Sequence, residues 1–210
     1  MEIELKYSIN TPELFDEILN DSWVLEHAES SVPEEVRMKA AYFDTEDRVL
    51  TRNNIAFRIR TEGSRTLATL KWKDDDEGIS GLYVRSEINI PVSDPSCFFH
   101  PDPEIFIESE DGASLLEVLE GKQLVNVFDM IFSRKRLRID VGRSILEIAC
   151  DEGVIVAGSK SEEMREMEIE IYSGSRDDLF EAGKVLAGKY DLKPETRTKF
   201  ARGIALLSKM

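Results

Sequence analysis

The sequence has few residues for thiol, disulfide or imidazole chemistry: its 210 residues include two cysteines and two histidines. Two cysteines are too few for a disulfide framework or a thiolate zinc site, so we expect Cys97 and Cys150 to be buried and unreactive. His27 and His100 both lie in irregular stretches. A histidine is therefore not expected as a general base.

Long apolar segments are also missing. No stretch approaches the roughly 20 apolar residues that a membrane-spanning helix needs. The first residues, Met1 to Glu4, have neither the basic nor the apolar region of a signal peptide. These absences predict a cytoplasmic protein without a membrane partner.

Positive charge is scarce as well. There are 27 Lys plus Arg against 42 Asp plus Glu, which gives a formal net charge of −15. Nucleic-acid binding draws its affinity mostly from Lys and Arg on phosphates, so we expect no nucleic-acid partner. The G-x-x-x-x-G-K-[ST] pattern of a P-loop phosphate site does not occur either.

The sequence contains no internal repeat and no long Pro/Gly/Ser linker, which predicts a single domain over residues 1–210. Its irregular stretches are residues 20–33, 74–81 and 93–112. The acidic run at 74–77 is expected to be a solvated hairpin loop. The 93–112 excursion could pack on the rest of the chain or support a homodimer, and its apolar residues do not decide between these.

Alternation of apolar and polar residues, typical of half-buried strands, recurs in eight segments. They are residues 2–9, 37–44, 55–62, 65–73, 83–92, a stretch within 124–141, 145–151 and 163–172. Short turns join most of them, which favours antiparallel pairing.

Helical signals are fewer. One helix is expected with Thr11 as its N-cap and Pro12 at its first position, and a short one from Ser114. A third is expected from Ser175 to near Gly188, and a last one over residues 198–207. Together these patterns predict a β-rich α+β fold built on an antiparallel sheet or barrel.

The second face of the predicted strands is unusually charged, and the signs sort by strand. Basic side chains at alternate positions are Lys6, Arg58, Arg60, Lys71, Lys73, Arg85, Arg134, Arg136 and Arg138. Acidic ones are Glu2, Glu4, Glu87, Glu147, Asp151, Glu166, Glu168 and Glu170.

For any one strand, such a face most often looks at water. Rows of like charge cost free energy, however, unless the fold brings opposite charge or an ion beside them. If the sheet closes with this face inward, basic strands confront acidic strands across a lumen. Such a lumen could hold a polyanion on its basic wall and a divalent metal on its acidic wall.

A series of motifs then resembles a known family. Glu2-Ile3-Glu4-Leu5-Lys6 is similar to the Glu-x-Glu-x-Lys signature of the CYTH superfamily, the triphosphate tunnel metalloenzymes. The motifs that follow in order are Tyr42-Phe43-Asp44-Thr45, Phe57-Arg58-Ile59-Arg60, Thr69-Leu70-Lys71, Arg85-Ser86-Glu87, Arg134-Lys135-Arg136, the segment from Leu146 to Gly153, the segment from Glu166 to Glu170, and the segment from Thr198 to Gly203. The resemblance spans residues 2 to 203.

The resemblance implies a closed antiparallel tunnel of about eight strands with flanking helices. It also implies Mg²⁺ or Mn²⁺ as cofactor, with two ions during turnover. By motif, the expected metal ligands are Glu2, Glu4, Glu168, Glu170, Glu147 and Asp151. The expected triphosphate ligands are Lys6, Arg58, Arg60, Lys71, Arg85, Arg134, Arg136 and Lys199. Catalytic roles are expected for Glu147, Asp151 and Lys6, the two acids positioning water. The directions of Glu87, Arg134, Arg138 and Glu166 stay open.

The expected activity is metal-dependent hydrolysis of a small-molecule triphosphate, foremost inorganic tripolyphosphate. Only Met1 precedes the signature, so the His-Phe pair of class IV adenylate cyclases is missing, which counts against a cyclase. Trp72 alternates with Lys71 and should point out of the lumen, which disfavours a ring-stacking thiamine site. Organic triphosphates, a cyclase and a non-catalytic polyphosphate- or nucleotide-binding tunnel remain as alternatives.

Overall fold

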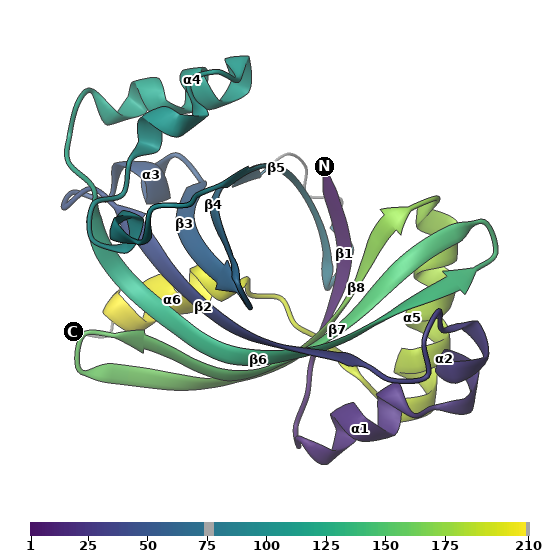
Figure 1. Ribbon diagram of the computed structural model, residues 1–210. Coiled ribbons are helices and arrows are strands. Elements are labelled where there is room, and N and C mark those ends of the chain that lie inside the picture. The colour runs from purple at the N-terminus through teal and green to yellow at the C-terminus, as the bar shows by residue number, and fades with distance from the viewer. Residues whose placement is uncertain (74–77, 209–210) are drawn as a thin grey trace.

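The computed structural model, which describes residues 1–73 and 78–208, has an antiparallel β-barrel at its centre (Figure 1). Strands follow the order β5-β4-β3-β2-β6-β7-β8-β1-β9, and β5 also pairs with β1, so eight of them form a closed ring. This closure confirms the predicted α+β fold with a closed barrel of about eight strands. The acidic run at 74–77, predicted to be a hairpin loop, lies outside the described residues.

The bounds of the elements are as follows. The strands are β1 (Glu2–Ser8), β2 (Glu34–Asp44), β3 (Ile55–Glu62), β4 (Arg65–Lys73), β5 (Leu82–Pro91), β6 (Val125–Val141), β7 (Ser144–Ala157), β8 (Lys160–Ser173) and β9 (Lys193–Pro194). The α-helices are α1 (Glu13–Leu19), α2 (Ser22–His27), α3 (Val49–Arg52), α4 (Glu110–Leu116), α5 (Arg176–Tyr190) and α6 (Lys199–Ser208), and short 3₁₀ turns cover Pro95–Phe98, Pro103–Phe106 and Glu117–Leu119.

All eight predicted strands are present, but several helix ends differ from prediction. The first helix has Pro12, not Thr11, at its N-cap, without a side-chain cap bond. Helix α4, which was predicted to start at Ser114, begins at Glu110. Ser109 Oγ accepts a hydrogen bond from the amide of Gly112 and caps the helix, so Ser114 lies inside it. Helices α2 and α3 have too few apolar repeats to be predicted from period alone.

Side chains on the outer face of the barrel pack against helices on two sides. Apolar residues of β1, β7 and β8 pack with those of α1, α2 and α5, while β3 and β4 are covered by the 93–119 segment (Figure 1). Phe106 of that segment is fully buried, as predicted by the packing alternative, and a homodimer stays a prediction. Cys97 and Cys150 are free and buried, as expected.

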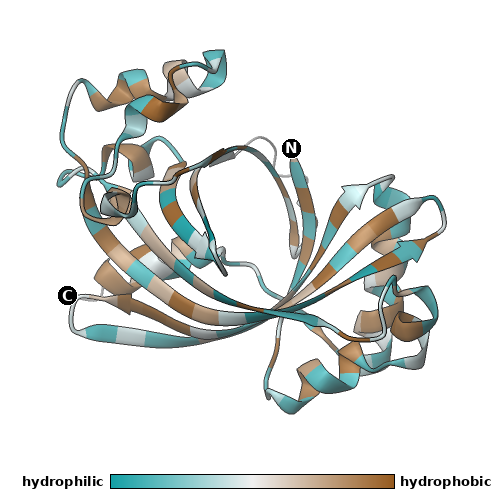
Figure 2. Cartoon of the chain, in the orientation of Figure 1, coloured by the Kyte–Doolittle hydropathy of each residue, from teal (hydrophilic) through white to brown (hydrophobic). Residues whose placement is uncertain are grey.

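The inner face of the barrel changes from apolar to charged along its length. In β6, Phe128, Met130 and Phe132 share this face with Arg134 and Arg136, since alternate residues of a strand point the same way. Figure 2 shows hydrophobic and hydrophilic residues as brown and teal bands along the long strands. The apolar end is covered by α6, so the charged end is left as a lumen.

Close packing fixes the position of α6. A Cβ atom on Gly203 would come within 2.4 Å of the Phe128 ring, so only glycine lets the helix approach β6 this closely. No helix within residues 1–73 and 78–208 is long and apolar enough to cross a membrane.

Candidate functional site

The charged end of the barrel encloses a cavity of about 200 Å³. Every barrel strand contributes to its wall, because the inward positions recur at every second residue. Its lining includes thirteen predicted site residues: Glu2, Glu4, Lys6, Arg58, Arg60, Lys71, Arg85, Arg134, Arg136, Glu147, Glu168, Glu170 and Lys199. The remaining predicted residue, Asp151, is fully buried outside this lining.

The structure also gives the directions that the sequence left open. Glu87 and Arg134 line the cavity. Glu166 is fully buried and ion-paired with Lys199. Arg138 lies at the edge, with its guanidinium 4.0 Å from the centre of the Tyr172 ring and its Nε 3.5 Å from a Glu147 oxygen.

Three arginines on the basic wall have buried nitrogen atoms without a hydrogen-bond partner among the described residues. These atoms are Arg58 Nε, Arg60 Nε and Arg85 Nη2. Burial, together with the charges of Arg58 and Arg134, lowers the pKa of Arg60 to about 10. Buried donors of this kind are costly unless paired, so this wall is suited to an anion that accepts several hydrogen bonds.

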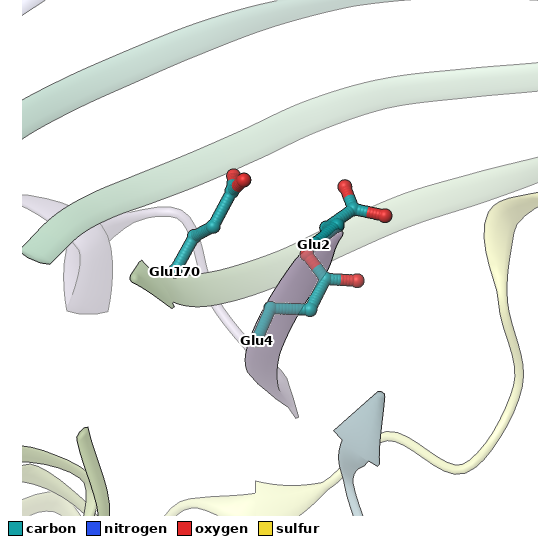
Figure 3. Close-up of side chains that lie close together, drawn as sticks. All are labelled: Glu2, Glu4 and Glu170. Atoms are coloured by element: carbon teal, nitrogen blue, oxygen red, sulfur yellow. The ribbon is translucent and has the colours of Figure 1, made fainter. Parts of the chain in front are cut away.

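Three carboxylates converge on the acidic wall (Figure 3). Oxygens of Glu2, Glu4 and Glu170 all lie within 4.8 Å of one another, and Glu4 and Glu170 are direct partners in the β1–β8 pairing. Burial, together with the charge of Glu168, raises the pKa of Glu4 to about 7. Burial and the charges of Glu2 and Glu4 raise that of Glu170 to about 8. A divalent cation would relieve this crowding, and carboxylate oxygens are the donors that hard cations prefer.

A second carboxylate group, Asp151, Glu166 and Glu168, also has oxygens within 4.8 Å of one another. Here the Lys199 ammonium, carried by α6, already contacts all three: it is 2.8 Å from Asp151, 2.7 Å from Glu168 and closer still to Glu166. Although burial opposes it, Arg134 and Lys199 lower the pKa of Asp151 below its ordinary value. This group is therefore neutralised by the protein's own cations.

A larger pocket of about 720 Å³ adjoins the lumen. It shares Ala56, Lys71, Arg85 and Phe200 with the lumen lining, and its other walls include Trp72 and Tyr83. Trp72 is absent from the lumen lining, in agreement with its predicted outward direction.

Some lining residues were not predicted as site residues. Glu62, which accepts a hydrogen bond from Arg136 at 2.7 Å, shares strand parity with Arg58 and Arg60 and could have been found that way. Tyr42 belongs to one of the motifs but was given no site role, and its hydroxyl accepts a hydrogen bond from Arg58 at 3.3 Å. Phe200 lines the cavity from α6, a placement that no strand pattern could indicate.

Residues 1–204 match the model of the CYTH domain, and the chain belongs to this family. It is 29% identical over 216 residues to the inorganic triphosphatase of Haemophilus influenzae, an alignment that covers 99% of this chain and 55% of that protein. The chain thus spans about half the length of the curated relative it matches.

Two solved structures have a similar fold. One is a putative adenylyl cyclase from Hippeastrum described as having a dominant triphosphatase activity, with a TM-score of 0.63, 18% identity and coverage of 98% of this chain and 96% of that one. The other is a putative adenylate cyclase from Bacillus halodurans, with a TM-score of 0.61, 21% identity and 96% of each chain covered. At these identities the similarity concerns the fold alone.

Proposed function

We propose that the protein hydrolyses a triphosphate in the lumen, with inorganic tripolyphosphate as the foremost substrate, giving pyrophosphate and phosphate. One observation carries this proposal: buried guanidinium atoms without a partner among the described residues line the same cavity of about 200 Å³ as a three-carboxylate cluster. The similarity of the chain to the inorganic triphosphatase of Haemophilus influenzae supports the same substrate class.

Glu2, Glu4 and Glu170 would hold a Mg²⁺ or Mn²⁺ ion, because their oxygens converge and carry crowded like charge. When bound, such an ion would neutralise negative charge on the phosphate oxygens. The second ion expected during turnover would rest on Glu147, the direct partner of Glu170 in the β7–β8 pairing. Glu168 and Asp151 would support it less directly, since Lys199 and Arg134 already bond to both.

The chain's own residues would bind and orient the phosphates. Arg58, Arg60 and Arg85 each have a donor that is unpartnered within residues 1–73 and 78–208, and these donors would contact phosphate oxygens directly. Arg136 and Lys71 are bonded to carboxylates and would exchange these partners for phosphate. Lys6, Arg134 and Lys199 would mainly hold the acidic residues in place and add positive charge.

Phosphoryl transfer needs an aligned nucleophile and stabilisation of charge more than covalent chemistry. Glu147 lines the lumen, with Arg136 at 3.8 Å and Arg138 at 3.5 Å, and would accept a hydrogen bond from the attacking water. Asp151 would act through Arg134, to which both of its oxygens bond.

Phosphate release from tripolyphosphate, ATP and thiamine triphosphate, each with Mg²⁺ or Mn²⁺, tests the proposal. We expect fastest release from tripolyphosphate and loss of release with EDTA. Absence of release from all three at micromolar protein, with tight tripolyphosphate binding, would instead favour a non-catalytic tunnel.

An organic triphosphate is the second candidate, and the adjoining pocket of about 720 Å³ favours it. Its shared residues would let a triphosphate lie in the lumen while an attached ring occupies the pocket beside Trp72 and Tyr83. A higher kcat/KM for thiamine triphosphate or ATP than for tripolyphosphate would establish this reading. Cyclic AMP formation from ATP would indicate a cyclase.

A further inference from the structure

Lys71 lies between two carboxylates from different strands. Its ammonium donates hydrogen bonds to both oxygens of Glu2, at 2.7 and 2.8 Å, and lies 2.8 Å from an oxygen of Glu87. The backbone fixes this arrangement, because Lys71 and Glu87 are direct partners in the β4–β5 pairing and β5 also pairs with β1, which carries Glu2. An ammonium has three donors, and these contacts use all of them.

The contact with Glu2 joins the two halves of the lumen. Glu2 belongs to the three-carboxylate cluster, whereas Lys71 belongs to the basic wall. While Lys71 remains on Glu2, both Glu2 oxygens are engaged and Lys71 has no donor left for a phosphate. A metal ion would therefore compete with Lys71 for Glu2, and a triphosphate would compete with Glu2 for Lys71.

We propose that Lys71 is an exchangeable counter-ion and that Glu87 is its positioning residue. In the metal-free tunnel Lys71 neutralises Glu2. Once Glu2 is taken by a divalent ion, Lys71 stays anchored on Glu87 and turns its freed donors to the triphosphate. This inference rests on the proposed function and adds an order to it: metal binding prepares the phosphate site. By linkage, the triphosphate strengthens metal binding by the same factor.

The competing explanation is a general effect of positive charge near the cluster. Arg85 separates the two, because it is the direct partner of Glu2 in the β1–β5 pairing and also lines the lumen. Both Glu2 oxygens, however, bond to Lys71. Removing either positive charge should raise the affinity for a metal ion by simple electrostatics. Only removal of Lys71 also frees the Glu2 oxygens from their hydrogen bonds to the ammonium.

Calorimetric titration of Mn²⁺ without triphosphate tests the exchange on folded, purified variants. Lys71→Met should tighten Mn²⁺ binding about tenfold, and Arg85→Met clearly less. Glu87→Gln should weaken Mn²⁺ binding, because Lys71 then rests on Glu2 alone. The same Glu87 change should have a much smaller effect when added to Lys71→Met, since Glu87 acts through Lys71. Lys71→Gln serves as the second variant if the methionine variant does not fold.

A second readout uses imidotriphosphate, a triphosphate analogue that resists hydrolysis. Its affinity is measured with and without Mn²⁺ for the wild type and for Lys71→Met. The factor by which Mn²⁺ raises the affinity for imidotriphosphate should be larger in the wild type. Equal tightening of Mn²⁺ by Lys71→Met and Arg85→Met, or an unchanged enhancement factor, overturns this inference and leaves the proposed hydrolysis standing. Absence of Mn²⁺ binding by the wild type overturns both.

Discussion

Arg134 and Asp151 face each other across β6 and β7 and form a two-pronged ion pair, with Nε to Oδ1 and Nη2 to Oδ2 both 2.7 Å. Asp151 is fully buried, and it also contacts the Lys199 ammonium at 2.8 Å. A carboxylate so fully paired holds its neighbours in place and leaves little capacity for a metal ion. Motif position gave it a metal role, but its surroundings favour a positioning role.

Asp151→Asn should therefore lower stability far more than metal affinity. The change removes a charge that pairs with Arg134 and Lys199, while Arg134 keeps its bond to Glu168. The loss should therefore lie near the lower end of the about 3–5 kcal/mol of unfolding free energy that breaking a buried ion pair costs. Urea unfolding measures this loss, and the control is Asp140→Asn, an exposed change on β6, the strand that carries Arg134. Loss of Mn²⁺ binding without loss of stability would show that Asp151 is a metal ligand after all.

Metal affinity should rise with pH. In the metal-free protein the pKa of Glu4 is raised to about 7 and that of Glu170 to about 8, so both hold protons that a cation must displace. Mn²⁺ binding should tighten between pH 6 and 8.5 and release protons, which calorimetry in buffers of different ionisation enthalpy detects. Equal affinity at both ends of this range would contradict the crowded cluster.

The same raised pKa values predict how stability depends on pH. An unfolded Glu has a pKa near 4.5, so between this value and about 8 the folded state binds more protons than the unfolded state. Stability of the metal-free protein should thus fall as pH rises through this window. Thermal unfolding with EDTA and with Mn²⁺ tests this, because the cation should remove most of the loss.

Glu170→Gln should abolish most metal-dependent turnover while leaving the fold intact. The change removes a charge that the cluster already disfavours, so the melting temperature should hold or rise. We expect kcat to fall about a hundredfold or more, since charge stabilisation is lost in the transition state. Glu4→Gln should behave alike, and Glu163→Gln, an exposed change on the same strand as Glu170, is the control.

Arg58→Ala should act chiefly on substrate binding. Arg58 is half-buried in the basic wall, and its buried Nε has no hydrogen-bond partner among the described residues. A charged hydrogen bond to phosphate contributes about 1.5–3 kcal/mol, so KM should rise about 10- to 100-fold with a smaller change in kcat. Steady-state kinetics with tripolyphosphate measure this, with the exposed Arg143→Ala as control. A fall in kcat at unchanged KM would assign Arg58 to the chemical step.

Substitution of alanine for two glycines in helices should have opposite effects on stability. At Gly203 a Cβ atom would come within 2.4 Å of the Phe128 ring, so Gly203→Ala should displace α6 and cost about 1–3 kcal/mol. A Cβ atom on Gly188 in α5 would have no atom of another described residue within 4 Å, so Gly188→Ala should stabilise the fold by about 0.5–1 kcal/mol. Urea unfolding of the pair separates packing from helix propensity. Equal effects would mean that α6 is loosely seated.

Strand parity predicted most of the lumen because it depends only on the period of the backbone. It placed Arg58, Arg60, Glu168 and Glu170 on one inner face, and the structure brings these residues to a single cavity. Parity gives the face of a side chain but not its depth along the barrel. For this reason the burial of Asp151 and the approach of α6 could not be predicted.

The predicted helix-capping residues were wrong for a related reason. Ser109 and Ser114 are equally good capping residues, and tertiary packing chose the first, since Gly112 lies against Phe106 where a Cβ atom would clash. The local signals conflict, because the acidic Glu110 and Asp111 follow Ser109 while Glu117 lies three residues after Ser114.

The gradient along the inner face of β6 limits how this chain can vary in length. Phe132 packs with α6 and Arg134 lines the charged lumen, two residues apart on one strand. Insertion of a single residue between them would turn Arg134 and Arg136 outward and bring Lys135 into the lumen, removing two cations and their fixed spacing. Evolutionary insertions should therefore be confined to the hairpin ends, such as those at Gly142 and Gly158, where the added residues project beyond the barrel.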